Sequence, residues 1–64
     1  MTQTIAILRR LPGEKIPRPY TRACSQSEAQ DMLGRPVQID WSKLNSDEAV
    51  AEIYGAEFFA FTEQ

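Results

Sequence analysis

The chain has 64 residues, with seven basic and nine acidic side chains, one cysteine and no histidine, so its net charge is −2. This length allows one domain, which buries only about 60% of the surface that its unfolded chain exposes and is therefore marginally stable. One cysteine cannot close an intrachain disulfide, and the lack of histidine excludes Ser-His and Cys-His nucleophile activation as well as thiol–imidazole metal sites. We expect a single domain over residues 1–64 that is not an enzyme and holds no metal or cofactor.

The N-terminal segment MTQTIAILRR has a short apolar run followed by two arginines. A secretory signal peptide has the opposite order and a longer apolar core. No stretch of the chain approaches the length of a transmembrane helix. The sequence therefore predicts a cytoplasmic protein without a membrane contact, in which Cys24 is a reduced thiol.

Residues 4–24 predict a β-hairpin. The segment TIAILRRL is rich in aliphatic and β-branched residues and ends at Pro12-Gly13, which suits a type II turn from Leu11 to Glu14. The chain then returns through residues 15–24 as a second strand. Pro17 and Pro19 cannot donate ladder hydrogen bonds, so this strand is expected at the edge of a sheet.

Two helices and two further strands are expected after the hairpin. Ser25 precedes Glu28 at capping-box spacing, and Gly34 is a natural stop for a first helix. The alternating segment 37–41, VQIDW, predicts a half-buried strand. Asn45 and Glu48 then repeat the capping pattern ahead of a second helix that stops at Gly55.

The aromatic segment 56–64 predicts a final strand, although an extension of the second helix through this segment is an alternative. The expected fold is a small α+β domain with the order β-β-α-β-α-β and both helices on one face of a mostly antiparallel sheet. The predicted core consists of Ile5, Ile7, Leu8, Met32, Leu33, Val37, Ile39, Trp41, Val50, Ile53, Phe59 and Phe61.

Charge is segregated along the chain. Residues 1–24 contain five basic residues and one acidic residue, whereas residues 25–64 contain two basic and eight acidic residues. Such asymmetry can mark a binding face, although the two halves can also neutralise each other across the fold. On the second predicted helix, Glu48 and Glu52 offer an acidic surface that suits a basic groove on a partner.

The segment KIPRPYTRAC is the candidate basic surface. In an extended strand Arg18, Tyr20 and Arg22 project to the same side, where arginines can bind phosphates and tyrosine can stack a base. Arg9 and Arg10 on the preceding strand, with Lys15 near the turn, enlarge this patch. The alternative interpretation is that Ile16 and Tyr20 pack inward and the arginine stems cover apolar surface.

These features favour a non-catalytic binding protein that acts as a small inhibitor or adaptor on a partner protein through its segregated charges. An oligomeric binder of a small anionic ligand such as a nucleotide is the alternative, and nucleic-acid binding through the basic hairpin is a second one. The negative net charge makes nucleic acid the least favoured partner. A homodimer formed through an exposed strand edge, or by burying Tyr54 and Phe58, is compatible with all three hypotheses.

The chain is also similar, in size and general character, to the short accessory proteins of bacteriophages and mobile elements. Proteins of that kind inhibit host or defence proteins or sequester signalling nucleotides. The resemblance implies a binding function rather than catalysis, and no motif carries it.

Overall fold

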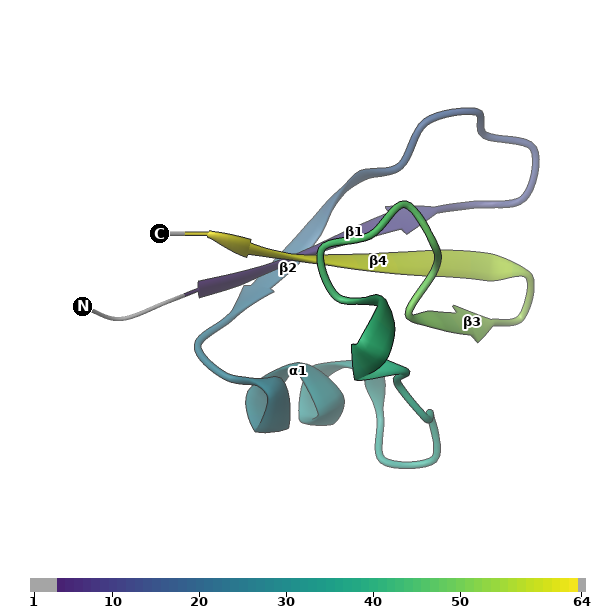
Figure 1. Ribbon diagram of the computed structural model, residues 1–64. Coiled ribbons are helices and arrows are strands. Elements are labelled where there is room, and N and C mark those ends of the chain that lie inside the picture. Colours follow the sequence, from purple (N-terminus) through teal and green to yellow (C-terminus); the bar gives the residue numbers. More distant parts are fainter. Residues whose placement is uncertain (1–3, 64) are drawn as a thin grey trace.

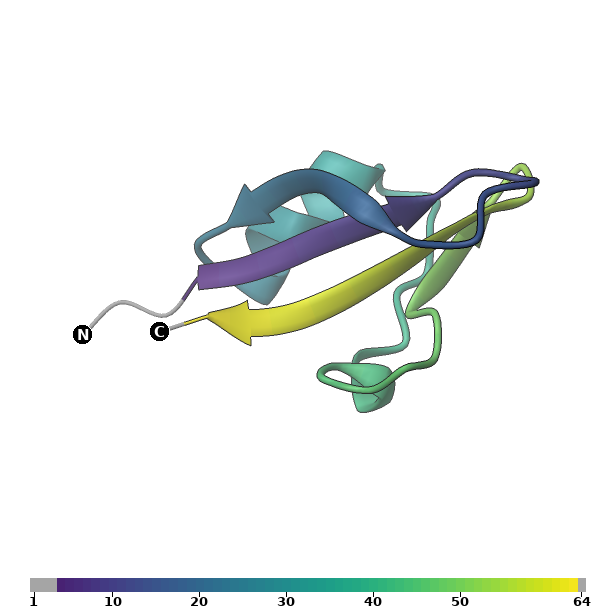
Figure 2. The same cartoon turned by 90° about the horizontal axis from the view of Figure 1, so that it is seen from above.

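The structure, a computed structural model, describes residues 4–63. The strands form one antiparallel sheet in the order β2-β1-β4-β3, and α1 lies against one face of it (Figure 1). The opposite face is turned toward the viewer in Figure 2, where α1 lies behind the strands. The elements are β1 (Thr4–Arg10), β2 (Arg18–Ala23), α1 (Gln26–Leu33), the short 3-10 helix η1 (Trp41–Lys43), β3 (Ala51–Ile53) and β4 (Ala56–Glu63).

The α+β class and the antiparallel sheet are as predicted, but the predicted order of elements is wrong. The observed order is β-β-α-β-β, with η1 between α1 and β3. One of the two expected helices and one of the expected strands do not form, while a short strand that was not expected does.

The β1–β2 hairpin confirms its prediction. The Glu14 N–H donates to the Leu11 carbonyl at 3.0 Å, and Gly13 has φ 88°, the left-handed conformation that a type II turn requires at its third position. β2 is the outermost strand on its side of the sheet. The proline-containing strand is therefore an edge strand, as expected.

A register shift interrupts the pairing of β1 with β2. Ile7 lies opposite Thr21 and Leu8 lies opposite Pro19, so Tyr20 has no partner on β1. An extra residue of this kind is a β-bulge, which changes the direction of the side chains beyond it. The bulge therefore breaks the expected alternation along this strand.

The first helix also forms as predicted. The Ser25 hydroxyl accepts a hydrogen bond from the Glu28 N–H at 3.2 Å, which satisfies one of the free donors of the first turn. Gly34 ends the helix with φ 106°. Ala29 and Leu33, one helical turn apart, are buried against the sheet.

The strand predicted at residues 37–41 is wrong, because this segment is a loop that leads into η1. The alternation of buried and exposed side chains is nevertheless as predicted. Val37, Ile39 and Trp41 pack on the core, while Gln38 and Asp40 are exposed. The Asp40 N–H donates to the Val50 carbonyl, which is one bond rather than a ladder. The outer position beside β4 is occupied instead by β3.

The second predicted helix is also wrong. Asn45 does not cap a helix; it takes φ 63°, and its side-chain oxygen accepts the Thr62 N–H at 2.7 Å. The Asn45 N–H donates to the Ala60 carbonyl at 2.9 Å. These bonds satisfy the edge of β4 beyond the end of β3, so the segment follows the sheet rather than coiling.

The final strand is confirmed over residues 56–63, and the alternative of a long C-terminal helix is wrong. Gln64 lies outside the described residues. Tyr54 and Gly55, with φ 51° and 84°, connect β3 to β4. Two consecutive positive φ angles are characteristic of a type I′ hairpin turn, so Gly55 serves this turn and does not stop a helix.

The core lies between α1 and the sheet, with Ile7 fully buried at its centre. Met32 was predicted to be buried but is 43% exposed, and Leu8 and Phe61 lie half-buried on the other side of the sheet. Phe58, expected as an exposed dimer contact, is buried. The main core cluster is Ile5, Ile7, Ala23, Ala29, Leu33, Val50, Ala51, Ala56, Phe58 and Ala60.

Candidate functional site

A basic hairpin surface, formed by Arg9, Lys15, Arg18 and Tyr20, lies at the turn end of β1 and β2. Arg9 and Arg18 are direct partners in the sheet. The Arg9 guanidinium lies 4.7 Å from the centre of the Tyr20 ring, and that ring meets Phe58 edge-on at 5.4 Å. This stack connects Arg9 to the hydrophobic core and fixes its position.

Two arginines directly opposite each other repel, and local contacts offset this repulsion. Arg18 forms an ion pair with Glu14 at 3.3 Å, while Arg9 is held over an aromatic face. The Arg18 side chain remains 79% exposed. An ion pair this exposed contributes little to stability, so a carboxylate from another molecule can replace Glu14.

The remaining predicted arginines lie on the opposite face of the sheet. Arg10 forms an ion pair with Glu57, and Arg22 forms one with Glu63 at 3.1 Å. Because of the bulge at Tyr20, Arg22 no longer shares a face with Tyr20 and Arg18. The expected basic patch is therefore divided between the two faces of the sheet, and Arg10 and Arg22 are paired with glutamates of β4.

Two large apolar side chains are exposed near the basic hairpin surface. Ile16, between the turn and β2, is 74% exposed, and Tyr54 in the β3–β4 turn is 99% exposed. The two turns lie side by side, since a Cβ added to Gly55 would lie 3.3 Å from Pro12 Cγ. This end of the molecule therefore combines positive charge with exposed apolar side chains.

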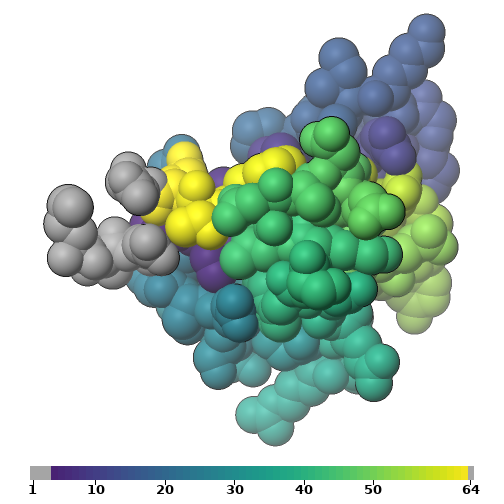
Figure 3. Space-filling view, viewed as in Figure 1, coloured from purple at the N-terminus to yellow at the C-terminus, as the bar shows by residue number. Residues whose placement is uncertain are grey.

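A second charged region, the acidic hollow, lies where the loop after η1 meets β3 and β4. It has a volume of about 470 Å³. Glu48 and Glu52, expected on one helix, both line it, although Glu48 is in the loop and Glu52 is in β3. The segment that supplies much of its lining forms a continuous surface in Figure 3 (green). Its charged residues are Asp40, Asp47, Glu48, Glu52 and Glu57, with Arg10 and Lys43.

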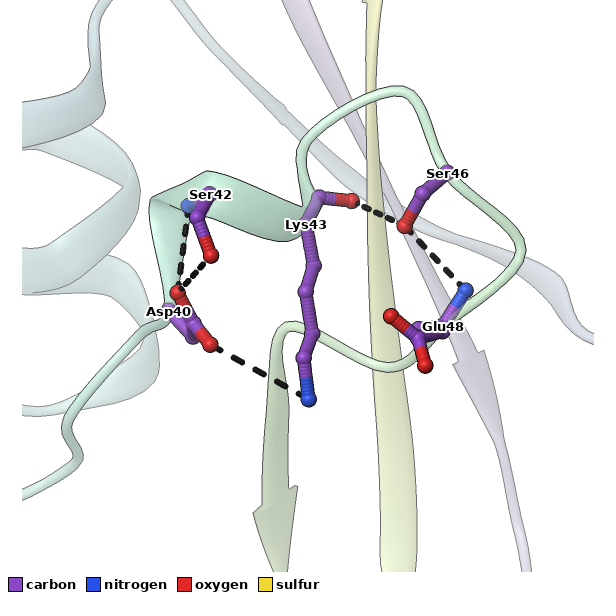
Figure 4. Close-up of polar contacts among 5 residues, drawn as sticks. All are labelled: Asp40, Ser42, Lys43, Ser46 and Glu48. Atoms are coloured by element: carbon purple, nitrogen blue, oxygen red, sulfur yellow. Dashed lines mark hydrogen bonds and ion pairs between the residues drawn. The ribbon is translucent and has the colours of Figure 1, made fainter.

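Hydrogen bonds organise the rim of the acidic hollow (Figure 4). The Asp40 carboxylate accepts from the hydroxyl and the N–H of Ser42 and pairs with Lys43 at 3.9 Å. Ser46 donates to the Lys43 carbonyl at 2.6 Å and accepts the Glu48 N–H at 3.2 Å. The hydrogen bond from the Ser42 hydroxyl, then that from its N–H, lowers the pKa of Asp40, and Lys43 adds to this effect.

The hollow does not have the geometry of a metal centre. Within residues 4–63, no three acidic or thiol side chains converge closely enough to hold a metal ion. Glu52 and Glu57 are cross-strand partners, and the pairing of Arg10 with Glu57 offsets their repulsion. The arrangement presents negative charge to solvent and is suited to contact with a cationic surface.

Of the residues proposed from the sequence, the structure places Arg9, Lys15, Arg18 and Tyr20 in the basic hairpin surface, and Glu48 and Glu52 in the acidic hollow. The alternative of an inward-packed Ile16 is wrong, because its side chain is 74% exposed, and the sequence did not indicate that Asp47 joins the hollow. Nothing local in the sequence brings Asp47 near Glu57, since their proximity depends on strand register.

Comparison with known proteins gave no similarity on which to base a function: no family model, curated protein or solved structure matches the chain. Over the described part of the chain, no helix has the length and apolarity needed to cross a membrane. The chemistry of the two charged regions is therefore the basis for a functional proposal.

Proposed function

We propose that this is a non-catalytic binding protein, a small inhibitor or adaptor that occupies a site on a partner protein. The observation that carries the proposal is Ile16, an apolar side chain 74% exposed between the turn and β2, with Lys15 and the 79%-exposed Arg18 close by in the chain. Folding does not require an isoleucine at this position. An exposed apolar side chain beside cations is typical of a contact surface.

The chemistry of this surface indicates an acidic patch with an apolar pocket on the partner. Binding would exchange the weak surface pair of Arg18 and Glu14 for an intermolecular one, while Ile16 enters the pocket. Charge complementarity would accelerate association and exclude basic proteins. The acidic hollow, elsewhere on the molecule, offers the reverse complement and fits an adaptor that contacts two partners.

A nucleotide or another small anion is a less well supported occupant of the basic hairpin surface. One face of the Tyr20 ring is covered by the Arg9 guanidinium and Phe58 meets the ring edge-on, so at most one face of it is free for base stacking. Nucleic acid would meet a chain with a net charge of −2 and a divided set of arginines. Both alternatives predict thermal stabilisation by the ligand and are tested by that measurement.

The test begins with affinity capture on the immobilised full chain, followed by purification of the captured protein and titration of the binary complex. We expect Lys15→Glu with Arg18→Glu to raise Kd by at least about tenfold, with a salt-dependent association rate. Arg35→Glu, an exposed charge reversal in the loop after α1, is the matched control and should leave Kd unchanged. Equal affinity of all variants, or stabilisation by nucleotides without any captured protein, would contradict the proposal.

A further inference from the structure

β4 is apolar on both faces, which is unusual for a strand in a sheet with a helix on one side only. Phe58 and Ala60 face α1 and belong to the core, whereas Phe59 and Phe61 face the other way. An antiparallel sheet with one face in water normally carries polar residues on that face. The pattern of β4 is that of a strand covered on both sides.

Within the described chain, only part of this second face is covered. Phe59 is 5% exposed, with the Arg10 guanidinium 5.5 Å from its ring centre, and it lines the acidic hollow beside the loop after η1. Phe61 is only half-buried and lies directly opposite Ala6 of β1. The small alanine beside the large ring makes a step on the surface.

Beside Phe61, over β1 and β2, lies an open hollow of about 480 Å³. Ala6, Leu8 and Pro19 line its floor, and the paired Arg22 and Glu63 line one end. In Figure 2 the start of β2 passes in front of the C-terminal half of β1, and no helix or loop lies in front of the N-terminal half of β1. A ring the size of Phe61 fits such a hollow. The same face therefore carries both a protruding aromatic side chain and a place to receive one.

The charges of the face balance at each end. Arg22 and Glu63 form an ion pair that reaches over β1 from β2 to β4, and Arg10 pairs with Glu57 toward the other end. A face with equal numbers of positive and negative groups has no preference for an acidic or a basic partner. At the Arg22–Glu63 end the face is complementary to its own copy, because a twofold rotation that exchanges the β2 side with the β4 side brings Arg22 toward the partner's Glu63. Arg10, on β1, keeps its pair with Glu57 of the same chain.

We propose that a second copy of this chain covers the face, sheet against sheet, with the twofold axis parallel to β1 and above it. This rotation exchanges the β2 side with the β4 side. Phe61 of one copy then lies over the hollow of the other, and Glu63 approaches the partner's Arg22. The basic hairpin loop and the β3–β4 turn remain outside the contact.

The size of the face sets the strength of this dimer. Eight residues of β4 at about 3.4 Å each, and three strands about 4.8 Å apart, give a face of roughly 400 Å² per copy. Specific stable interfaces bury about 800 Å² per partner, so this one is about half that size and falls in the range of weak, transient contacts. The dimer is therefore weak and forms reversibly with concentration.

Sedimentation equilibrium of the full chain, from low micromolar to millimolar concentration, tests the proposal. We expect the mass to rise from one chain toward two. Arg22→Glu and Glu63→Arg should each raise the dimer dissociation constant by at least about tenfold, because each places like charges across the contact. An equimolar mixture of the two variants should recover dimerisation, since one chain then carries two glutamates and its partner two arginines.

Recovery in the mixture cannot arise from an intrachain pair, so it identifies the contact between chains. Ala6→Gln, which fills the hollow without adding a charge beside Arg22 and Glu63, should also abolish the dimer, and Arg35→Glu outside the contact should not. Circular dichroism checks that each variant is folded. A wild-type chain that stays monomeric at every concentration, or a mixture no better than its components, would overturn the proposal without bearing on the partner bound by Ile16 and Lys15.

Discussion

Residues 25–34 and 45–55 have the same local pattern but different structures. Each begins with a capping residue, Ser25 or Asn45, carries a glutamate three positions later, and ends at a glycine. The first segment forms α1, and the second forms a loop, the strand β3 and a hairpin turn. The comparison shows that a capping pattern permits a helix but does not decide whether one forms.

The difference lies in the side chains that each segment can bury. Ala29 and Leu33 are four positions apart, so a helix places both against the sheet. In the second segment the buried residues are the adjacent Val50 and Ala51, and the Val50 N–H donates to the Phe58 carbonyl at 2.7 Å. Tertiary packing therefore outweighs the local preference for a helix.

The largest effect on this comparison is expected from Phe58→Ala. Phe58 is the β4 partner of Ala51, and burial of its ring stabilises the pairing of β3 with β4. Loss of the ring should reduce the free energy of unfolding by about 3–5 kcal/mol, measured by urea titration. Phe61→Ala, on the half-covered face, is the control and should cost clearly less at dilute concentration; equal losses would refute this account.

Asn45→Ala should have the next largest effect. The variant loses the hydrogen bonds to Thr62 and forces a Cβ-bearing residue without a polar side chain into φ 63°, which together cost about 2 kcal/mol of unfolding free energy. Asn45→Gly retains the backbone conformation and should cost about half as much. If alanine and glycine destabilise equally, backbone conformation does not explain why this segment avoids a helix.

Ser25→Ala sharpens the same comparison at the helix. It removes the acceptor for the Glu28 N–H and should lower stability by about 1 kcal/mol. Helical ellipticity should decrease at the same time. Asn45→Ala is the corresponding change in the second segment and should leave the helical signal unchanged; a decrease there would mean that residues 45–54 do form a helix in solution.

The smallest effect is expected on the stability of the fold at acidic pH. The pKa of Asp40 lies below its ordinary value of 3.8, chiefly because the Ser42 hydroxyl donates to the carboxylate. A lowered pKa in the folded state stabilises the fold above the ordinary value, and this contribution is lost as pH falls through the lower one. Asp40→Asn should remove this pH dependence and Ser42→Ala should weaken it, followed by Trp41 fluorescence on thermal unfolding. A wild-type-like acid profile in Asp40→Asn would argue against the hydrogen bond.

The predictable parts of the fold are those encoded by neighbouring residues. Pro12-Gly13 specified its turn, Ser25 specified the helix start, and the two prolines near β2 specified an edge. The segment 37–41 revealed which side chains face the core, but not its backbone, because alternation is also satisfied by an extended loop that packs on a sheet. The bulge at Tyr20 depends on how two strands align, and it decided which arginines share a surface.

Both edges of the sheet are poorly suited to the addition of another strand. On one side the border is β2, which contains Pro19 and a bulge; on the other, β3 has only three residues and Asn45 occupies the backbone of β4 beyond it. Neither border offers a long, straight row of free backbone groups for strand addition. Concentrated solutions should accordingly resist fibril growth and bind little thioflavin, even though aromatic residues are frequent in the C-terminal strand.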